Sequence, residues 1–202
     1  MVTSTYPPLR VAGEEDIDGI ADLIGHAFVH MPIIRFLVPD ESRRLQVSRD
    51  WYRLYIAHAI GGAGQVVTTE DSSAAAVWFD RTSEASEPED YQKRLADIAG
   101  EDLPRFEELD REMETHHPSE PHWHLLFLAV RPDRWSQGLG SALMEHTHTR
   151  LDAEGTAGYL EATSKQNRRL YQRHRYQDMN PATLTVSDGT ALFRMWRPAS
   201  RG

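Results

Sequence analysis

Residues 121–143 read PHWHLLFLAVRPDRWSQGLGSAL and contain the clearest local structure signals in the sequence. His122–Val130 predicts a strand whose two faces are apolar beyond the histidines, as expected where both faces of a sheet are covered. The chain then turns through proline and polar residues, passes two glycines and continues as a helix to about Ala153. Gly155 suits the left-handed position that ends many helices. The stretch therefore predicts a strand, a glycine-containing turn and a helix in succession.

The turn has the chemistry of an anion site. A helix N-terminus offers free N–H groups and the positive end of the helix dipole, and glycine lets the backbone approach a phosphate closely. No Gly-Lys-Ser/Thr follows, so it is not a P-loop, and Gly138-Leu139-Gly140 lacks the third glycine and the later acidic residue of a dinucleotide fingerprint. From these residues alone, a pyrophosphate cradle and a plain tight turn both stay open.

Periodicity and turn residues predict the elements on either side. Strands are expected over 9–12 and 159–163, and hairpins over 65–69 with 74–79 and 183–186 with 191–196. Helices are expected from the acidic cluster at 14–16 to Phe28, where Met31-Pro32 ends the run, and over 41–60 and 167–174. The result is a mixed α/β fold with a strand–helix–strand unit at its centre.

Residues 82–121 differ from the rest because they are strongly charged, with helical segments at about 88–99 and 104–115. Their apolar content is too thin for a separate core. We therefore expect one domain over residues 1–202 with a charged helical insertion at about 82–121.

Composition narrows the class of protein. The chain has 202 residues, 40% of them hydrophobic, which suits one domain with a sizeable core. No apolar run approaches the roughly 20 residues of a membrane span, and the start MVTSTYPPLR has no signal-peptide pattern. We expect a cytoplasmic protein that binds no membrane.

Charge and cysteine content exclude further classes. The sequence has no cysteine, which removes disulfides, thiolate metal sites and a cysteine nucleophile. Its formal charge is −9, whereas a duplex-binding surface needs basic residues, so nucleic acid is not an expected partner. Acidity raises the local concentration of cationic small molecules, although it also serves solubility.

Taken together, VRPDRWSQGLGSALM, YLEAT, and Asn167 and Tyr171 within NRRLYQRHRY resemble the GCN5-related N-acetyltransferase (GNAT) family, and most closely its puromycin N-acetyltransferase branch. The likeness is strong over 121–176 and diffuse before that. It implies an α/β (α+β) fold with a mixed, mostly antiparallel sheet of six to seven strands and helices on both faces. It also implies a splay between the fourth and fifth strands.

The resemblance implies acetyl-CoA as cosubstrate and assigns its contacts residue by residue. Main-chain groups near Ala129 and Val130 would pair with the pantetheine arm as an added strand does. Asn167 would contact the cosubstrate, and Tyr171 would lie beside the thioester sulfur. The pyrophosphate cradle would comprise Trp135, Ser136, Gln137, Gly138, Leu139, Gly140 and Ser141.

This sequence departs from the family pattern at the cradle. Trp135 stands where Arg or Gln is usual, Ser136 where Gly is usual, and Gln137 where a basic residue is usual. Arg131 and Arg134 are near enough in sequence to supply the missing charge. Arg175 also replaces a family glycine, which is costly if the backbone there needs a positive φ. These departures bear on cosubstrate affinity more than on the fold.

Direct attack of an amine on the thioester is expected, because no cysteine can carry the acyl group. Tyr171 is the expected acid for the leaving thiolate, with a core tyrosine as the alternative. Glu161 is an ionisable group in an apolar strand, and it serves either as base or substrate anchor or as a structural carboxylate. His124 is the other expected base, since histidine titrates in the useful range; a satisfied ring is its alternative. His122 ranks below it.

The remaining polar clusters are less specific. The acceptor site is expected to involve aromatic and charged residues of the N-terminal half, for which ordinary packing is the alternative: His30, Arg35, Trp51, Tyr55 and Trp78. The histidine-rich run 116–124 raises the question of a zinc ion. No HExxH helix accompanies it and the family needs no metal, so no metal cofactor is expected.

The leading hypothesis is an acetyl-CoA-dependent N-acetyltransferase that acts on a primary amine of a small molecule, such as an aminonucleoside or aminosugar antibiotic. The alternatives are acetylation of a protein or peptide amine, and a non-catalytic acyl-CoA-binding regulatory domain suggested by the altered cradle. A monomer or a homodimer is expected. The sequence leaves the acceptor unidentified.

Overall fold

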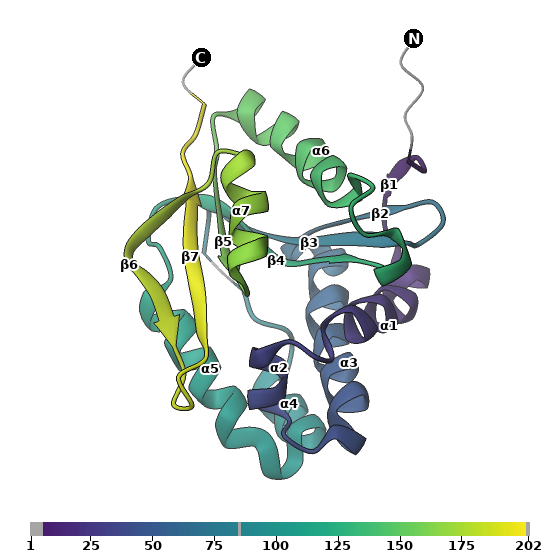
Figure 1. Cartoon of the computed structure of the whole chain (residues 1–202), viewed down its shortest axis with the longest axis vertical. Helices are drawn as coiled ribbons and strands as arrows, with labels where there is room; N and C mark the ends of the chain where they lie inside the picture. The colour runs from purple at the N-terminus through teal and green to yellow at the C-terminus, as the bar shows by residue number, and fades with distance from the viewer. Residues whose placement is uncertain (1–5, 85, 201–202) are drawn as a thin grey trace.

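The computed structural model describes residues 6–84 and 86–200 of the chain. Its strands form one sheet with the order β1-β2-β3-β4-β5-β7-β6 (Figure 1). In the described sheet β4 and β5 are parallel and every other neighbouring pair is antiparallel. The strands are β1 (Leu9–Val11), β2 (Gly64–Thr69), β3 (Ala74–Arg81), β4 (His122–Val130), β5 (Ala157–Ala162), β6 (Gln177–Thr185) and β7 (Ala191–Arg197).

Helices cover both faces of this sheet. One face, called the α3 face, is packed by α1 (Ile17–Phe28), α2 (Pro32–Leu37), α3 (Glu41–His58), α4 (Tyr91–Ala99) and α5 (Leu103–His116). The other, called the α6 face, is packed by α6 (Leu139–Glu154) and α7 (Lys165–Arg173). In Figure 1, α6 lies above the sheet and α1 and α3 lie below it. Within the described residues, no helix combines the length and apolar character that crossing a membrane requires.

Alternation along β4 divides its side chains between the two faces. Trp123 and Leu125 belong to the apolar core of the α6 face, and Phe127 and Ala129 to that of the α3 face. The switch occurs because Val77 of β3 pairs with Phe127 whereas the next residue pairs with Leu125, so β4 contains a β-bulge. The strand is covered on both sides, as its apolar run predicts.

The ladder between β4 and β5 is short. It begins at His122 with Ala157 and ends at Leu125 with Leu160, so the remaining half of β4 diverges from β5. This is the expected splay between the fourth and fifth strands. On its other edge, β4 stays paired with β3 as far as Val130 with Ala74.

Most expected elements are present, and two differ. The run at 32–37 forms α2 because Pro32 occupies the first helical position, where its missing N–H costs nothing; Met31-Pro32 therefore starts a helix as well as ending one. Strand β6 begins at Gln177 rather than Thr183. The segment 91–116 is helical, as expected of the charged region, and α4 and α5 contribute Leu95 and Phe106 to the main core.

Candidate active site

The turn after β4 presents backbone N–H groups to solvent. A short 3-10 turn (Pro132–Arg134) leads to Ser136 and Gly138, which have φ of 60° and 84°. The Ala142 N–H donates to the Gly138 carbonyl at 2.9 Å and so closes the first turn of α6. The N–H groups between these two residues therefore precede the helical ladder. A Cβ built on Gly138 meets no atom within 4 Å, so the space before the helix is open and suits an anionic group.

Two departures from the family pattern fall at positions with a positive φ. Ser136 and Arg175 both adopt the left-handed conformation, with φ of 60° and 69°. Only glycine adopts this conformation at no steric cost, which accounts for the glycines usual at these positions. The backbone keeps the same conformation here although the residues are serine and arginine.

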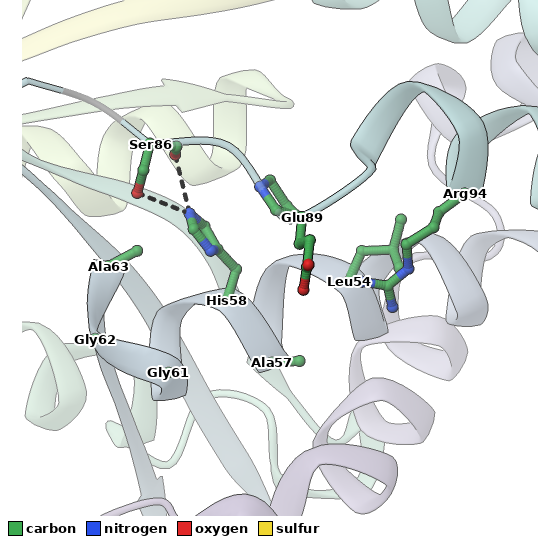
Figure 2. Close-up of a pocket in the computed structure, with 10 residues that line it drawn as sticks. Leu54, Ala57, His58, Gly61, Gly62, Ala63, Ser86, Glu89 and Arg94 are labelled. Atoms are coloured by element: carbon green, nitrogen blue, oxygen red, sulfur yellow. Dashed lines mark hydrogen bonds between the residues drawn. The ribbon is translucent and has the colours of Figure 1, made fainter.

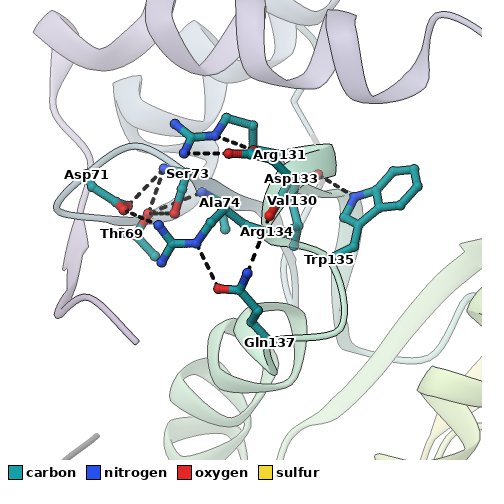
Figure 3. Close-up of polar contacts among 10 residues, drawn as sticks. All are labelled: Thr69, Asp71, Ser73, Ala74, Val130, Arg131, Asp133, Arg134, Trp135 and Gln137. Atoms are coloured by element: carbon teal, nitrogen blue, oxygen red, sulfur yellow. Dashed lines mark hydrogen bonds and ion pairs between the residues drawn. The ribbon is translucent and has the colours of Figure 1, made fainter. Parts of the chain in front are cut away.

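The arginines of the turn are engaged by carboxylates (Figure 3). Arg131 donates to Asp133 at 2.6 Å, and Arg134 lies 3.2 Å from Asp71 while its Nε donates to Gln137 at 2.9 Å. The Arg131 guanidinium holds the pKa of the Asp133 carboxyl below its usual value. The charge expected to compensate for the altered cradle is thus balanced by Asp133 of the same turn and by Asp71 of the β2–β3 turn.

Trp135 lies on the opposite side of the turn from these arginines (Figure 3). Its side chain is 59% exposed, and its indole Nε1 donates to the Val130 carbonyl at 2.8 Å. The Arg131 N–H donates to the Ser73 carbonyl, on the side of β3. Because the N–H and C=O groups of one peptide point in opposite directions, the Val130 carbonyl points away from β3, to the splayed edge. Ala129 directs its own main-chain groups towards β3 by the same alternation. Of the two expected pantetheine contacts, Val130 is on the open edge.

Helix α7 places the expected acid on the α6 face. Ser164 caps the helix by accepting from the Asn167 N–H, and the Asn167 amide donates to Thr163 at 3.0 Å. Tyr171 is 7% exposed and belongs to the same core as Leu125 and Leu160, the last pair of the β4–β5 ladder. Burial raises the pKa of Tyr171 well above its ordinary value, so the phenol stays protonated at neutral pH.

His124 and Glu161 form a buried pair on the α3 face. His124 Nε2 lies 2.7 Å from Glu161 Oε2, and the two side chains are 3% and 5% exposed. Burial acts to raise the pKa of Glu161, but the charge and hydrogen bond of His124 bring it below its usual value. Glu161 is therefore a carboxylate that orients an imidazole. The sequence nominates each residue separately as base, and the structure joins them into one dyad.

The dyad is surrounded by buried polar side chains from other elements. His117, which follows α5, makes edge-to-face contacts with His124 and Tyr159, with ring centroids 5.1 Å and 5.2 Å apart, and His122 lies 5.5 Å from Tyr159. Burial lowers the pKa of His117 to about 3 and that of His122 to about 4, so both rings are neutral at pH 7. The sequence does not predict that Tyr159 belongs to the site. The only signal for it is that it shares a strand face with Glu161, two residues away.

Several enclosed atoms of this cluster have no hydrogen-bond partner among the described residues. They are Arg81 Nε, His117 Nε2, His122 Nε2, Tyr159 Oη, Glu161 Oε1 and Arg194 Nε. Buried polar atoms are usually satisfied, so these suit bound water or the polar end of a substrate. No group of three or more His, Cys, Asp or Glu in the described parts of the chain is arranged to hold a metal ion.

The dyad and Tyr171 lie on opposite faces of the sheet. The side chains of Tyr159 and Glu161 alternate with those of Leu160 and Ala162, which belong to the α6-face core. The splay begins where the Leu125–Leu160 ladder ends, between the two groups. A reacting carbonyl in the splay could thus be approached by an amine from one face and release its leaving group towards the other.

The five residues expected at the acceptor site are not gathered together. Trp51 and Tyr55 lie in one aromatic cluster on the α3 face, with ring centroids 5.6 Å apart. His30 and Arg35 are exposed. Trp78 is fully buried in the core of the α6 face, because β3 alternation directs it away from the others.

Tyr55 also ties the core to the charged helical segment. Its hydroxyl donates to Tyr91 at 2.8 Å, and Tyr91 donates to Asp110 at 2.9 Å. Burial raises the pKa of Asp110 to about 6. The network holds α4 and α5 against α3.

A cavity of about 440 Å³ opens on this side of the molecule (Figure 2). Its lining includes His58 from the end of α3, Glu89 and Arg94. His58 stacks at 5.9 Å on Phe79, and Phe79 is the β3 partner of His124. Phe79 thus neighbours both His58 in the cavity lining and His124 of the dyad.

Comparison with known proteins agrees with this architecture. Residues 104–176 match the model of the acetyltransferase (GNAT) family. A solved structure from Corynebacterium glutamicum, described as histone acetyltransferase HPA2 and related acetyltransferase, is 28% identical with a TM-score of 0.75 over 98% of this chain and 99% of that one.

Two further solved structures share the fold at lower identity. The ribosomal-protein-S18-alanine N-acetyltransferase from Escherichia coli is 18% identical, with a TM-score of 0.56 over 96% of this chain and 95% of that one. The C-terminal condensation domain of Ebony, in complex with beta-alanyl-dopamine, is 16% identical, with a TM-score of 0.60 over 95% and 98%.

Proposed function

We propose that this chain, which matches the GNAT acetyltransferase family model over residues 104–176, transfers the acetyl group of acetyl-CoA to the primary amine of a small molecule. The observation that carries the choice of a small acceptor is the burial of the dyad. The side chains of His124 and Glu161 are 3% and 5% exposed, and His117 packs over them from the end of α5. A folded protein surface does not reach a site so enclosed, and this favours a small amine as acceptor.

The residues present fit acetyl-CoA. The open N–H groups before Ala142 suit a pyrophosphate, and the splayed edge of β4 suits the amides of a pantetheine arm. When bound, acetyl-CoA supplies the acetyl thioester. Asn167, on the first turn of α7, and Tyr171, one turn later, flank that edge from the α6 face.

The chemistry then divides between the two faces. His124 takes a proton from the acceptor ammonium, and the Glu161 carboxylate stabilises the imidazolium that forms. With acetyl-CoA bound, the amine nitrogen would bond to the thioester carbon as the carbon–sulfur bond breaks. Tyr171 would give its phenol proton to the departing sulfur, and the second proton lost by the nitrogen would restore the phenol by way of solvent. Positioning of both reactants in the splay supplies much of the rate.

The acceptor is expected to be cationic and polar. The chain carries a formal charge of −9, and the buried Glu161 carboxylate contributes a negative charge at the dyad. The resemblance to the puromycin N-acetyltransferase branch makes aminonucleosides and aminosugars the first acceptors to test. Inactivation of such an antibiotic is the role this activity would serve.

Protein acetylation is the second candidate, because the similar structure from Corynebacterium glutamicum is described as a histone acetyltransferase. The two candidates are separated by measuring free thiol release from acetyl-CoA with a panel of aminonucleosides, aminosugars and lysine peptides. Turnover with small amines alone supports the proposal. Turnover with peptides alone favours the second candidate, and acetyl-CoA binding without turnover on any amine favours a non-catalytic binding domain.

A further inference from the structure

Trp135 is held in an unusual place for a large aromatic side chain. Among the described residues, it and Val11 are the large hydrophobic side chains that are exposed. Its indole N–H nevertheless makes one well-formed hydrogen bond, 2.8 Å long, to the Val130 carbonyl. The ring is therefore anchored at the end of β4 by a single polar contact.

The carbonyl that Trp135 engages is one of those on the splayed edge of β4. The β4–β5 ladder ends at Leu125, and the Arg131 N–H is directed to Ser73 on the β3 side, so the Val130 carbonyl faces the open edge. An extended chain that contains amides binds such an edge by donating to its carbonyls. The indole N–H supplies the same kind of donor to the same atom.

The charges of the turn make this contact matter more. Arg131 and Arg134 are paired with Asp133 and Asp71, so their attraction for phosphates is reduced. The hydrogen bonds along the β4 edge then carry a larger share of cosubstrate affinity.

Building on the proposed acetyl-CoA site, we propose that Trp135 is a gate on the pantetheine path. In the free protein its indole N–H occupies the Val130 carbonyl, and the arm of the cosubstrate must displace it to pair with β4. The residue thereby sets the affinity and selectivity for pantetheine-bearing ligands. Loss of the indole N–H should tighten acetyl-CoA binding about threefold to tenfold, the range expected for release of one competing hydrogen bond.

The test compares the wild type with Trp135→Phe, which keeps an aromatic ring and removes the N–H donor. Calorimetric titration with acetyl-CoA should give a lower Kd for the variant. Adenosine 3′,5′-diphosphate, which has the nucleotide of CoA and no pantetheine arm, is the matched ligand and should bind both proteins equally. A gain of the same size with both ligands, or no gain with acetyl-CoA, overturns the gate.

A second readout follows the indole directly. Acetyl-CoA should change the tryptophan emission of the wild type, and the change should be absent in Trp135→Phe. Melting temperatures of the two proteins should agree, because the side chain is exposed. Failure of the wild type to bind acetyl-CoA at millimolar concentration would instead overturn the proposed function, so the two failures are distinguishable.

Discussion

His124 Nε2 and Glu161 Oε2 lie 2.7 Å apart across two parallel strands, enclosed on the α3 face. Replacement of Glu161 by Gln keeps the shape of the pair but removes the negative charge that stabilises a protonated imidazole. We expect kcat to fall by about 10-fold to 100-fold near neutral pH, which is less than the roughly 100-fold to 10,000-fold contribution of a general base because His124 itself remains.

The pH dependence separates this chemical role from a structural one. If the dyad serves to deprotonate the acceptor, the defect of Glu161→Gln should shrink as the pH rises towards the pKa of the amine. A loss of kcat that stays constant from pH 7 to pH 9.5, or that is accompanied by a lower melting temperature of the variant, would mean that Glu161 has a structural role. Progress curves with one amine across this range make the measurement.

Tyr171→Phe should lower turnover by an order of magnitude or more and leave acetyl-CoA affinity little changed. The phenol is buried and protonated, and its removal takes away the proton for the thiolate without opening a cavity. Steady-state kinetics and calorimetry on the same preparation give both values. Full activity in the variant would exclude Tyr171 as the acid.

Gly138→Ala should weaken acetyl-CoA binding at least tenfold. Gly138 has φ of 84° and an added Cβ would have no atom within 4 Å, so the methyl group would enter the open space of the cradle. Gly155→Ala is the matched control, because Gly155 ends the same helix with φ of 64° and equally open surroundings. Both variants should lose about 1 kcal/mol of unfolding free energy, and only the first should lose binding. Equal affinities would refute the cradle.

Ser136→Gly should stabilise the protein by about 0.5–1 kcal/mol. Ser136 adopts φ of 60°, which costs a non-glycine residue about 1–2 kcal/mol, and the entropy lost by a glycine on folding offsets part of the gain. Urea unfolding of the two proteins measures the difference. A destabilised variant would mean that the serine side chain, rather than the backbone, determines this position.

Acidification should destabilise the protein through its buried histidines. The pKa of His122 is lowered by burial to about 4, so below pH 6.5 the unfolded chain takes up a proton that the folded chain does not. Its contribution is complete above pH 6.5 and is lost as the pH falls towards 4. We expect about 1–2 kcal/mol from this group between pH 7 and pH 5.

His122→Gln should therefore show a shallower fall in unfolding free energy over that pH range than the wild type. His146→Gln, an exposed substitution on α6, should match the wild type. Parallel slopes in all three proteins would place the acid sensitivity elsewhere.

The centre of the fold was predictable because local signals agree there. The apolar run of β4, the glycines after it and the left-handed cap at Gly155 each point to the same strand–turn–helix unit. The start of β6 was not predictable, since Gln177–Pro181 is largely exposed at the sheet edge and shows no alternation of apolar residues. Helix α2 was missed because a proline after Met31 fits a helix end and a helix start equally.

The sequence predicts individual residues of the candidate site better than it predicts the contacts between them. His124 and Glu161 are 37 residues apart, and the register of two parallel strands leaves no local trace, so their hydrogen bond emerges only in three dimensions. The same holds for Trp135, whose hydrogen bond to Val130 depends on how the turn folds back. Trp78 shows the reverse, because β3 alternation places it in the opposite core.

The separation of Tyr171 and the dyad into different cores has a consequence for laboratory evolution. Under the proposed mechanism, substitutions on the α3 face would alter which amine is acetylated, and substitutions on the α6 face would alter how the thiol departs, because the sheet lies between the two cores. Changes at positions without shared contacts combine nearly additively. A library of variants substituted only on the α3 face would therefore sample new amine specificities and leave the groups that protonate the leaving thiolate unchanged. Amine specificity and thiol release could then be engineered separately.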